Sequence, residues 1–481
     1  MLDGWTIAGL LYALFEISGV LSAMHVLMHG RTPQGAIAWL LFLLAIPPLA
    51  VPLYWIFGPR KYANYVDSRL KADTPFDPVV DHLREAGEPF IVDLEEGQQG
   101  LRGSGLVSLE RLVRVPFLDH NDVELLIDGT ATFDAIFEAI DGAQDYVLLQ
   151  FFIVKADDIG KKLAAHLIAA RERGVRVYFL FDEIGSRKLS ASYLRELRGA
   201  GAEVKAFSTT RQSHRLQLNF RNHRKIVVAD GRVALTGGIN VGDEYLGHHQ
   251  RLSPWRDTFV RVTGPAVQVI QLSFLEDWHW ATDEIPEWNW DPAAAPSGRN
   301  RSVLVLPTGP ADPMETCSLV FVGLIHGARE RLWIATPYFV FDSQVTTALQ
   351  VAALRGVDVR IIVPGIGDHR STFFAGWSYY DEVLESGARI LKYGDGFPHQ
   401  KVVLVDDSIA MVGSANLDNR SMRLNFELGV LVEDRDFASE VEAMLQADLD
   451  RSTDVRRDEF GRKSFFFRLT ARFARLFAPI L

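Results

Sequence analysis

The chain has 481 residues, a formal net charge of -11 and a single cysteine. This length exceeds one ordinary domain and predicts about three units. The acidic balance argues against a protein whose main task is to grip nucleic acid, because that task usually needs a basic footprint. The lone Cys317 excludes an intramolecular disulfide bond and a cysteine metal cluster.

Two long apolar segments open the chain, at residues 5–28 and 36–57. Each is long enough to cross a hydrocarbon layer of about 30 Å as a helix, and the second contains no charged residue. We therefore predict two retained transmembrane helices, with a buried soluble hairpin as the alternative. Pro47, Pro48 and Pro52 should kink the second helix, because proline removes a helical hydrogen bond.

Basic residues beside the apolar segments predict the orientation. Four of them follow the second segment, Arg60, Lys61, Arg69 and Lys71, whereas the loop between the segments contains only Arg31. The positive-inside rule then places both termini and the body of the chain in the cytoplasm.

The body of the chain is an internal repeat. Residues 173–186, RGVRVYFLFDEIGS, match residues 355–368, RGVDVRIIVPGIGD. Helical patterns at 158–174 and 343–356 lie between apolar strands, and this alternation is typical of an α/β sandwich. We predict an α/β fold of two pseudo-symmetric domains with one site at their interface.

The predicted organisation has five parts. Two transmembrane helices occupy 1–58, a juxtamembrane linker 59–120, a first domain 121–296, a second domain 297–460, and a basic amphipathic helix 461–481.

The repeat carries two copies of one polar motif. HRKIVVADGRVALTGGIN at 223–240 and HQKVVLVDDSIAMVGSAN at 399–416 hold histidine, lysine, aspartate and asparagine at identical spacing. A lone His-x-Lys is a weak signal, but two copies in register inside a larger repeat are a strong one. The candidate catalytic residues are His223, Lys225, Asp230, His399, Lys401 and Asp406.

Strand geometry brings part of each motif to one face. Side chains alternate along a strand, so His223 and Lys225 point the same way, as do their counterparts in the second motif. Asp230 begins a hairpin turn at an odd distance from the histidine, and we interpret it and Asp406 as structural. Pairing across each hairpin predicts that Gly238, Asn240, Ser414 and Asn416 lie near the histidines and support phosphate binding. The glycines Gly237, Gly238 and Gly413 should allow the backbone to approach a ligand closely.

Two imidazoles, two ammonium groups and two amides suit a phosphodiester. A neutral histidine can attack phosphorus, and a protonated one can give its proton to the leaving alkoxide. Lysine and asparagine would hold the phosphate oxygens, so we expect neither a metal nor another cofactor. Each histidine needs an orienting carboxylate, and Asp257 and Glu427, at matching strand starts, are the candidates.

These motifs resemble those of the phospholipase D superfamily. Together with the two apolar segments, NFRNHRKIVVADG, GGINVGDEYLG, IATPYFV and GSANLDNRS make the chain similar to the bacterial cardiolipin synthases of the two-helix type. One departure is VFD at 340–342, where relatives commonly have a proline.

The resemblance implies a function, a location and roles. The family condenses two phosphatidylglycerols to cardiolipin and glycerol through a phosphatidyl-histidine intermediate, in the bacterial inner membrane, with a cytoplasmic catalytic domain. By this analogy His223 is the nucleophile, and the partners are membrane lipids rather than nucleic acid. Oligomeric state is left open. The rival interpretations are a hydrolytic phospholipase D, a nuclease of the same superfamily and a noncatalytic membrane scaffold.

The far end of the chain predicts a further membrane element. SFFFRLTARFARLFAPIL at 464–481 places phenylalanine and leucine on one helical face and Arg468, Arg472 and Arg475 on the other. This pattern favours a helix lying in an anionic membrane surface over one packed on the protein's own core.

Some polar residues keep two interpretations. Arg215, Arg221 and Arg420 can meet lipid phosphates or lie in solvated loops. The histidines of GHHQ at 247–250 are interpreted as loop residues.

Overall fold

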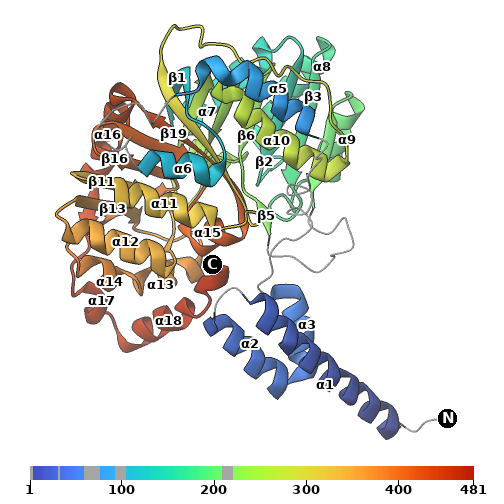
Figure 1. The fold of residues 1–481 in the computed structure, drawn as a ribbon, viewed down its shortest axis with the longest axis vertical. Helices are drawn as coiled ribbons and strands as arrows, with labels where there is room; N and C mark the ends of the chain where they lie inside the picture. The colour runs from blue at the N-terminus through green and yellow to red at the C-terminus, as the bar shows by residue number, and fades with distance from the viewer. Residues whose placement is uncertain (1–3, 31–32, 59–75, 93–104, 209–219) are drawn as a thin grey trace. The chain divides into compact units, whose positions relative to one another are not determined.

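A computed structural model describes residues 4–30, 33–58, 76–92, 105–208 and 220–481. The chain divides into two compact units (Figure 1). The first comprises Met1–Thr74 and Ser208–Phe220, and the second comprises Pro75–Phe207 and Arg221–Leu481.

The described residues of the first unit form three helices, α1 (Gly4–His29), α2 (Pro33–Ala45) and α3 (Pro47–Phe57). α1 is the one helix in the described part of the chain that is long and apolar enough to cross a membrane. The second apolar segment is not one continuous helix. It breaks at Ile46, whose φ of -141° is not helical, because a residue that precedes proline disfavours the helical conformation.

The α1 helix packs on both α2 and α3. Val26, Leu43, Ala50 and Tyr54 form the buried apolar contacts of this unit. The ring of His25 meets the hydroxyl of Tyr54, with 2.7 Å between Nδ1 and the oxygen. A polar group of α1 is thus satisfied by α3 rather than left in an apolar surrounding.

Several residues on which the orientation was predicted lie outside the described residues. They are Arg31, Arg60, Lys61, Arg69 and Lys71. Within the predicted linker the structure describes two helices, α5 (Asp77–Gly87) and α6 (Gly105–Val113), together with a short 3-10 turn η1 (Glu88–Phe90).

The second unit is built on one sixteen-stranded sheet made of two halves that repeat the same strand order. In the first half the order from the outer edge inward is β4-β3-β2-β6-β7-β9-β1, and in the second it is β14-β13-β11-β16-β17-β19-β10, with β20 outermost. The two halves join where β1 and β10 pair antiparallel. The first-half strands are β1 (Leu118–Ile127), β2 (Tyr146–Phe151), β3 (Arg176–Asp182), β4 (Glu203–Phe207), β6 (Ile226–Ala229), β7 (Val233–Gly237) and β9 (Thr258–Thr263). Those of the second half are β10 (Arg301–Thr308), β11 (Arg331–Ala335), β13 (Asp358–Pro364), β14 (Arg389–Tyr393), β16 (Val402–Val405), β17 (Ile409–Gly413), β19 (Asn425–Glu433) and β20 (Ser452–Asp454).

Each half has three parallel strands, and the inner ones are buried on both faces. All six residues of β2 are buried, as a near-continuous apolar run predicts for a parallel strand covered on both sides. In the first half one face is covered by α7 (Asp128–Gly142), α8 (Asp158–Glu172) and α9 (Ala191–Gly199), and the other by α10 (Ala266–Thr282). In the second half the corresponding layers are α11 (Thr316–Gly327), α12 (Ser343–Leu354) and α14 (Tyr380–Leu384), and opposite them α16 (Arg435–Asp450).

The repeat is visible in the helix caps. The carboxylate of Asp157 accepts a hydrogen bond from the backbone N–H of Gly160 at the start of α8, and Asp342 does the same for Val345 at the start of α12. The predicted α/β fold with two pseudo-symmetric halves is confirmed. The predicted domain limits stay predictions.

The remaining elements are short. The strands are β5 (Arg221–Asn222), β8 (Trp255–Arg256), β12 (Phe339–Val340), β15 (Phe397–Pro398) and β18 (Leu417–Asp418), and the helices are η3 (Asp243–Leu246), α13 (Arg370–Trp377), α15 (Asn419–Arg423), α17 (Glu459–Arg462), α18 (Phe465–Arg475) and η4 (Ala478–Ile480). Among these strands β5, which pairs with β19, is the sixteenth strand of the sheet.

Candidate active site

Each motif histidine follows a short strand that pairs with the opposite half. β5, just before His223, lies parallel to β19 of the second half, and the backbone N–H of His223 donates to Phe426 O at 2.9 Å. β15, just before His399, lies parallel to β8 of the first half. The backbone N–H of His399 donates to Arg256 O at 2.7 Å. These exchanged strands bring the two histidines to one cavity at the junction of the halves.

The orienting carboxylates are also exchanged between the halves. Nδ1 of His223 lies 2.9 Å from Oε2 of Glu427, and Nδ1 of His399 lies 2.8 Å from Oδ2 of Asp257. Both carboxylates are buried. A carboxylate that accepts the Nδ1–H fixes the tautomer and leaves Nε2 with its lone pair. The sequence indicated the two carboxylates but not that each serves the histidine of the other half.

Glu427 is the better supported of the two carboxylates. It also accepts hydrogen bonds from the hydroxyls of Ser414 (2.5 Å) and Ser421 (2.7 Å) and from the side-chain amide of Asn425 (3.1 Å). Burial by itself would raise the pKa of Glu427, but the contact with His223, the charge of Lys225 and the hydrogen bond from Ser414 lower it. Glu427 therefore stays ionised.

Burial and nearby positive charge hold both histidines neutral. Burial lowers the pKa of His223 to about 4, with the nearby ammonium groups adding to the shift and Glu427 opposing it. Burial and the charge of Lys401 likewise lower the pKa of His399, against the opposing carboxylates of Asp257 and Asp368. Two neutral imidazoles carry the lone pairs that nucleophilic attack and general-base catalysis need.

The two lysines lie beneath the histidines and do not line the cavity. Nζ of Lys225 donates to His223 O at 2.6 Å, and Lys401 makes the equivalent contact with His399 O. Burial lowers the pKa of Lys225 to about 7 and that of Lys401 to about 8. Their charge at neutral pH therefore depends on the negative groups nearby.

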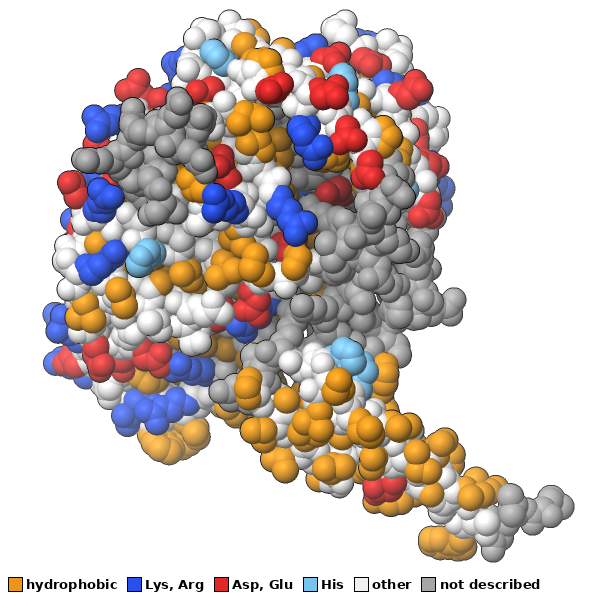
Figure 2. All heavy atoms as spheres, in the orientation of Figure 1, with side chains coloured by type: hydrophobic (Ala, Val, Ile, Leu, Met, Phe, Trp, Pro, Cys, Tyr) orange, Lys and Arg blue, Asp and Glu red, His pale blue; other side chains and the backbone are white. Residues whose placement is uncertain are grey.

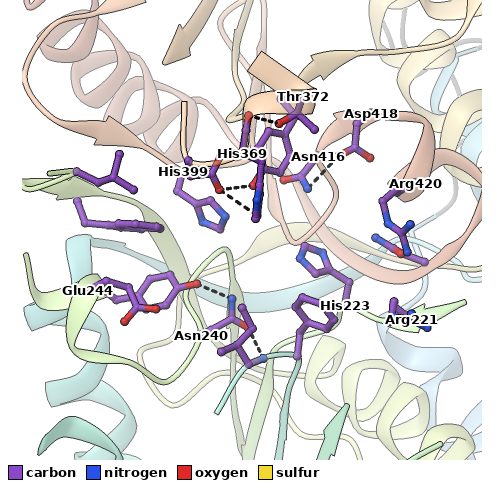
Figure 3. Close-up of a pocket in the computed structure, with 18 of the residues that line it drawn as sticks. Arg221, His223, Asn240, Glu244, His369, Thr372, His399, Asn416, Asp418 and Arg420 are labelled. Carbon is purple, nitrogen blue, oxygen red and sulfur yellow. Dashed lines mark hydrogen bonds and ion pairs between the residues drawn. The ribbon is translucent and has the colours of Figure 1, made fainter. Parts of the chain in front are cut away.

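The two asparagines do line the cavity, as the strand count predicted. Oδ1 of Asn240 accepts from the N–H of Ile153 at 3.1 Å, and its amide donates to the Tyr245 hydroxyl at 2.7 Å. The amide of Asn416 donates to Oδ2 of Asp418 at 3.2 Å. Both amides are therefore held in fixed orientations beside the histidines (Figure 3).

Asp230 and Asp406 lie in the hairpin turns and away from the cavity. Their φ angles are 54° and 53°, in the left-handed region that aspartate tolerates better than most residues. Each carboxylate accepts backbone N–H groups from the start of a neighbouring strand, at residues 144–146 for Asp230 and 329–331 for Asp406. These contacts fit a structural role.

The close approach at the motif glycines is to protein rather than to a ligand. A Cβ atom at Gly238 would lie 2.1 Å from Oδ1 of Asp257, so glycine here makes room for the carboxylate. A Cβ atom at Gly237 or Gly413 would likewise clash with the adjacent strand. Close protein packing thus accounts for these glycines, and a role in admitting a ligand stays a prediction. Ser414 occupies the position equivalent to Gly238 and instead donates to Glu427.

One cavity of about 570 Å³ collects these groups (Figure 3). Arg221 and Arg420, for which the sequence left two interpretations, both line it, and burial lowers the pKa of each. Their nearness to the motifs in sequence could have indicated this position. Arg221 lies two residues before one motif histidine, and Arg420 lies four residues after the second motif asparagine. Arg215 lies outside the described residues.

Two further residues of the cavity wall, Tyr338 and Asp368, were not indicated as site residues by any sequence pattern. Tyr338 donates its hydroxyl to Oδ2 of Asp368 at 2.6 Å, and both lie in loops that follow strands of the second half. His249 also lines the wall, but its Nδ1 accepts from the N–H groups of Arg251 and Leu252, which shape the loop. In the described part of the chain, no cluster of three His, Cys, Asp or Glu side chains is arranged to hold a metal ion.

The fold and the paired site define a member of the phospholipase D superfamily. A family model described as "Cardiolipin synthase, PLD-like domain" matches twice, at residues 136–278 and 321–449, and one described as "Phospholipase_D-nuclease N-terminal" matches residues 19–59. The chain is 45% identical over 477 residues to cardiolipin synthase A of Pseudomonas putida KT2440, covering 98% of both chains. It is 46% identical over 470 residues to cardiolipin synthase A of Pseudomonas fluorescens SBW25, covering 98% of this chain and 97% of that one.

A solved structure supports the fold independently. The crystal structure of phosphatidylserine synthase from Haemophilus influenzae Rd KW20 superposes with a TM-score of 0.59 at 19% identity, covering 79% of this chain and all of that one. The chain belongs to the cardiolipin synthases, a family of phosphatidyltransferases within that superfamily.

Proposed function

We propose that the protein joins two phosphatidylglycerol molecules into cardiolipin and releases glycerol, through a phosphatidyl-histidine intermediate. The observation that supports this most is the pair of exchanged histidine–carboxylate contacts opening on one cavity, 2.9 and 2.8 Å long. The curated relatives named cardiolipin synthase A support the choice of product.

In the first step Nε2 of His223 attacks the phosphorus of one phosphatidylglycerol. The bond from phosphorus to the headgroup glycerol breaks, and the departing oxygen takes a proton from His399. Negative charge brought by the phosphate raises the pKa of His399, because it favours the imidazolium form. Glu427 stabilises the positive charge that develops on His223.

In the second step His399, now neutral, accepts the proton of a hydroxyl on the second phosphatidylglycerol. The oxygen of this hydroxyl bonds to phosphorus while the bond to His223 breaks, which restores both histidines. The amides of Asn240 and Asn416 stabilise the phosphoryl oxygens by hydrogen bonds, and the two lysines beneath the histidines stabilise them by charge. Asp230 and Asp406 hold the turns and take no part in proton transfer.

Hydrolysis is the alternative outcome for the same intermediate. It shares the first step and differs only in that water accepts the phosphatidyl group. Association with a membrane favours the lipid acceptor, because it holds the cavity against a surface rich in lipid hydroxyls.

The family acts on membrane phospholipids and is membrane-associated. We further place this protein in a bacterial inner membrane, crossing it more than once, with its catalytic unit in the cytoplasm and no nucleic-acid partner. The long apolar α1 supports an anchor, and the sequence-based charge asymmetry supports the orientation.

To test this proposal, the full-length protein is incubated with vesicles of phosphatidylglycerol whose headgroup glycerol is labelled. Equal amounts of cardiolipin and labelled glycerol are expected, whereas phosphatidic acid as the lone lipid product would favour hydrolysis instead. His223→Ala and His399→Ala should each abolish turnover. His166→Ala is the matched control, because His166 also pairs with a carboxylate, Asp141 at 2.8 Å, but lies away from the cavity.

A further inference from the structure

The C-terminal helix α18 divides its apolar residues between two faces. Ala471 and Ala474 are buried in the core of the second half, and Phe467 packs against the same core. The helix lies along α13, and Phe467 meets the rings of Phe374 and Trp377 there. One side of α18 is therefore an ordinary protein interface, as the alternative interpretation of its sequence predicted.

The other side is an unusual apolar surface, which we call the phenylalanine face. It consists of the exposed side chains of Phe465, Phe466, Leu469, Phe473, Leu476 and Phe477. The other large apolar side chains exposed on this unit are scattered along the chain, between Ile91 and Ile366. A contiguous exposed patch of this kind usually marks an interaction site.

Basic side chains lie beside the phenylalanine face (Figure 2), although one of them, Arg462, is paired with Asp458. Arg456, Arg457, Arg462 and Arg472 are exposed, and no acidic residue follows Glu459 in the chain. Figure 2 shows lysine and arginine side chains beside an apolar patch at the lower left, where Figure 1 places α17 and α18. This edge is basic although the whole chain has a net charge of -11.

The third arginine of the predicted basic face has a different role. Arg475 donates to Ser378 O at 3.1 Å and pairs with Glu382 of α14 at 2.6 Å. It therefore fastens α18 to the catalytic unit, so that the phenylalanine face points away from the protein.

We propose that the phenylalanine face inserts into the headgroup region of an anionic phospholipid bilayer and docks the catalytic unit on the surface that holds its substrate. Aromatic and leucine side chains flanked by arginine are the chemistry of interfacial helices. A protein partner would need a complementary acidic rim around an apolar groove, whereas an anionic bilayer supplies both features in one surface.

The packing of α18 connects this surface to the active site. α13, which carries α18, also contributes Thr372 to the wall of the cavity. At the other end of the terminal segment, Leu481 O accepts the backbone N–H of Arg420, another residue of the wall. Docking on the bilayer therefore acts on two sides of the cavity through direct packing.

The test places an environment-sensitive fluorophore at two leucines of matched exposure. Leu476 on the phenylalanine face is 73% exposed and Leu354 at the end of α12 is 74% exposed. Full-length Leu476→Cys and Leu354→Cys proteins are reconstituted in vesicles that contain phosphatidylglycerol and lipids with nitroxide-labelled acyl chains. The wild-type chain, whose Cys317 is buried, is the labelling blank.

Quenching of the label at position 476 but not at 354 is the expected result. Replacing phosphatidylglycerol by a zwitterionic lipid, or replacing Arg462 and Arg472 by glutamine, should weaken that quenching. Equal quenching at both positions, or none at 476, would overturn the proposal. So would contact between labels at 476 in two copies of the chain, which would identify a protein interface.

An activity measurement extends the test. Phe466→Ser with Phe473→Ser should raise the lipid concentration needed for half-maximal turnover, while Leu354→Ser should not. The quenching readout requires no turnover, so a protein that docks without making cardiolipin would refute the proposed reaction and leave the docking surface standing.

Discussion

Replacement of Glu427 by glutamine removes the buried negative charge of one exchanged histidine–carboxylate pair and so tests whether that pair is needed for turnover. Glu427 is 1% exposed and accepts from His223 and three other side chains, so glutamine fills the same space but offers one oxygen and one NH₂ group. At least one of these donors then faces another donor, and His223 loses the group that fixes its tautomer.

The size of the effect follows from two contributions. A hydrogen bond to a charged group contributes about 1.5–3 kcal/mol, and about 1.4 kcal/mol corresponds to a factor of ten in rate. Loss of the His223 contact therefore costs about ten- to hundredfold. Glu427 also raises the pKa of Lys225, which is about 7, so its removal lets that ammonium lose its proton at neutral pH. We expect kcat to fall by about 10²–10⁴ in total.

The assay measures cardiolipin and released glycerol at saturating phosphatidylglycerol, alongside a thermal melt. Asp342→Asn is the control for burying an amide in place of a carboxylate, because Asp342 is buried and holds Ser318 and Val345 but does not line the cavity. The Asp342→Asn variant should have a lower melting temperature, but its folded fraction should keep its turnover. A folded Glu427→Gln protein that keeps more than about a tenth of wild-type kcat would refute the role assigned to the exchanged carboxylate.

Three further changes address the charge, the packing and the binding of the site. As pH rises through about 7, Lys225 loses the positive charge that stabilises the phosphate from beneath His223. As pH falls through about 4, His223 gains the proton that blocks attack. The pH profile of kcat/KM should therefore form a bell between these values, and a plateau extending beyond about pH 9 would contradict this. Gly238→Ala places a Cβ atom 2.1 Å from the Asp257 carboxylate, so turnover should drop about a hundredfold and the melting temperature should fall; unchanged turnover would show that the carboxylate can shift freely. Arg420→Gln removes a cation from the cavity wall and should raise KM for phosphatidylglycerol about tenfold, measured by varying its mole fraction in vesicles, and a KM equal to that of the wild type would exclude a role in binding.

Part of the site could be predicted from the spacing of residues that are close together in the sequence. His223 and Lys225 share a face because strand side chains alternate, and Asn240 returns to the same place because the turn at Asp230 fixes the register of the hairpin. The α/β halves followed from apolar strands that alternate with helical segments. These features depend on residues close together in the chain, so spacing alone predicts them.

Other features needed the folded molecule. Proline at position 47 accounts for the break at Ile46, but the packing of both α2 and α3 against α1 is a tertiary contact that spacing does not predict. The terminal helix packs Phe467, Ala471 and Ala474 against the second half, as one sequence interpretation predicted, while Phe465, Phe466 and Phe473 stay exposed. A hydrophobic pattern gives the faces of a helix but not the surface that each one meets.

The sequence by itself determined the family chemistry: two motifs in register, with every polar group needed to transfer a phosphatidyl group. Only the tertiary structure decided which groups work together. Glu427 lies 204 residues from His223, and Asp257 lies 142 from His399, so no local spacing connects them. β5 and β15 cross to the opposite half, and this exchange makes each histidine depend on the other domain for its carboxylate. Two repeats that are separately recognisable in sequence thus form one indivisible site in space.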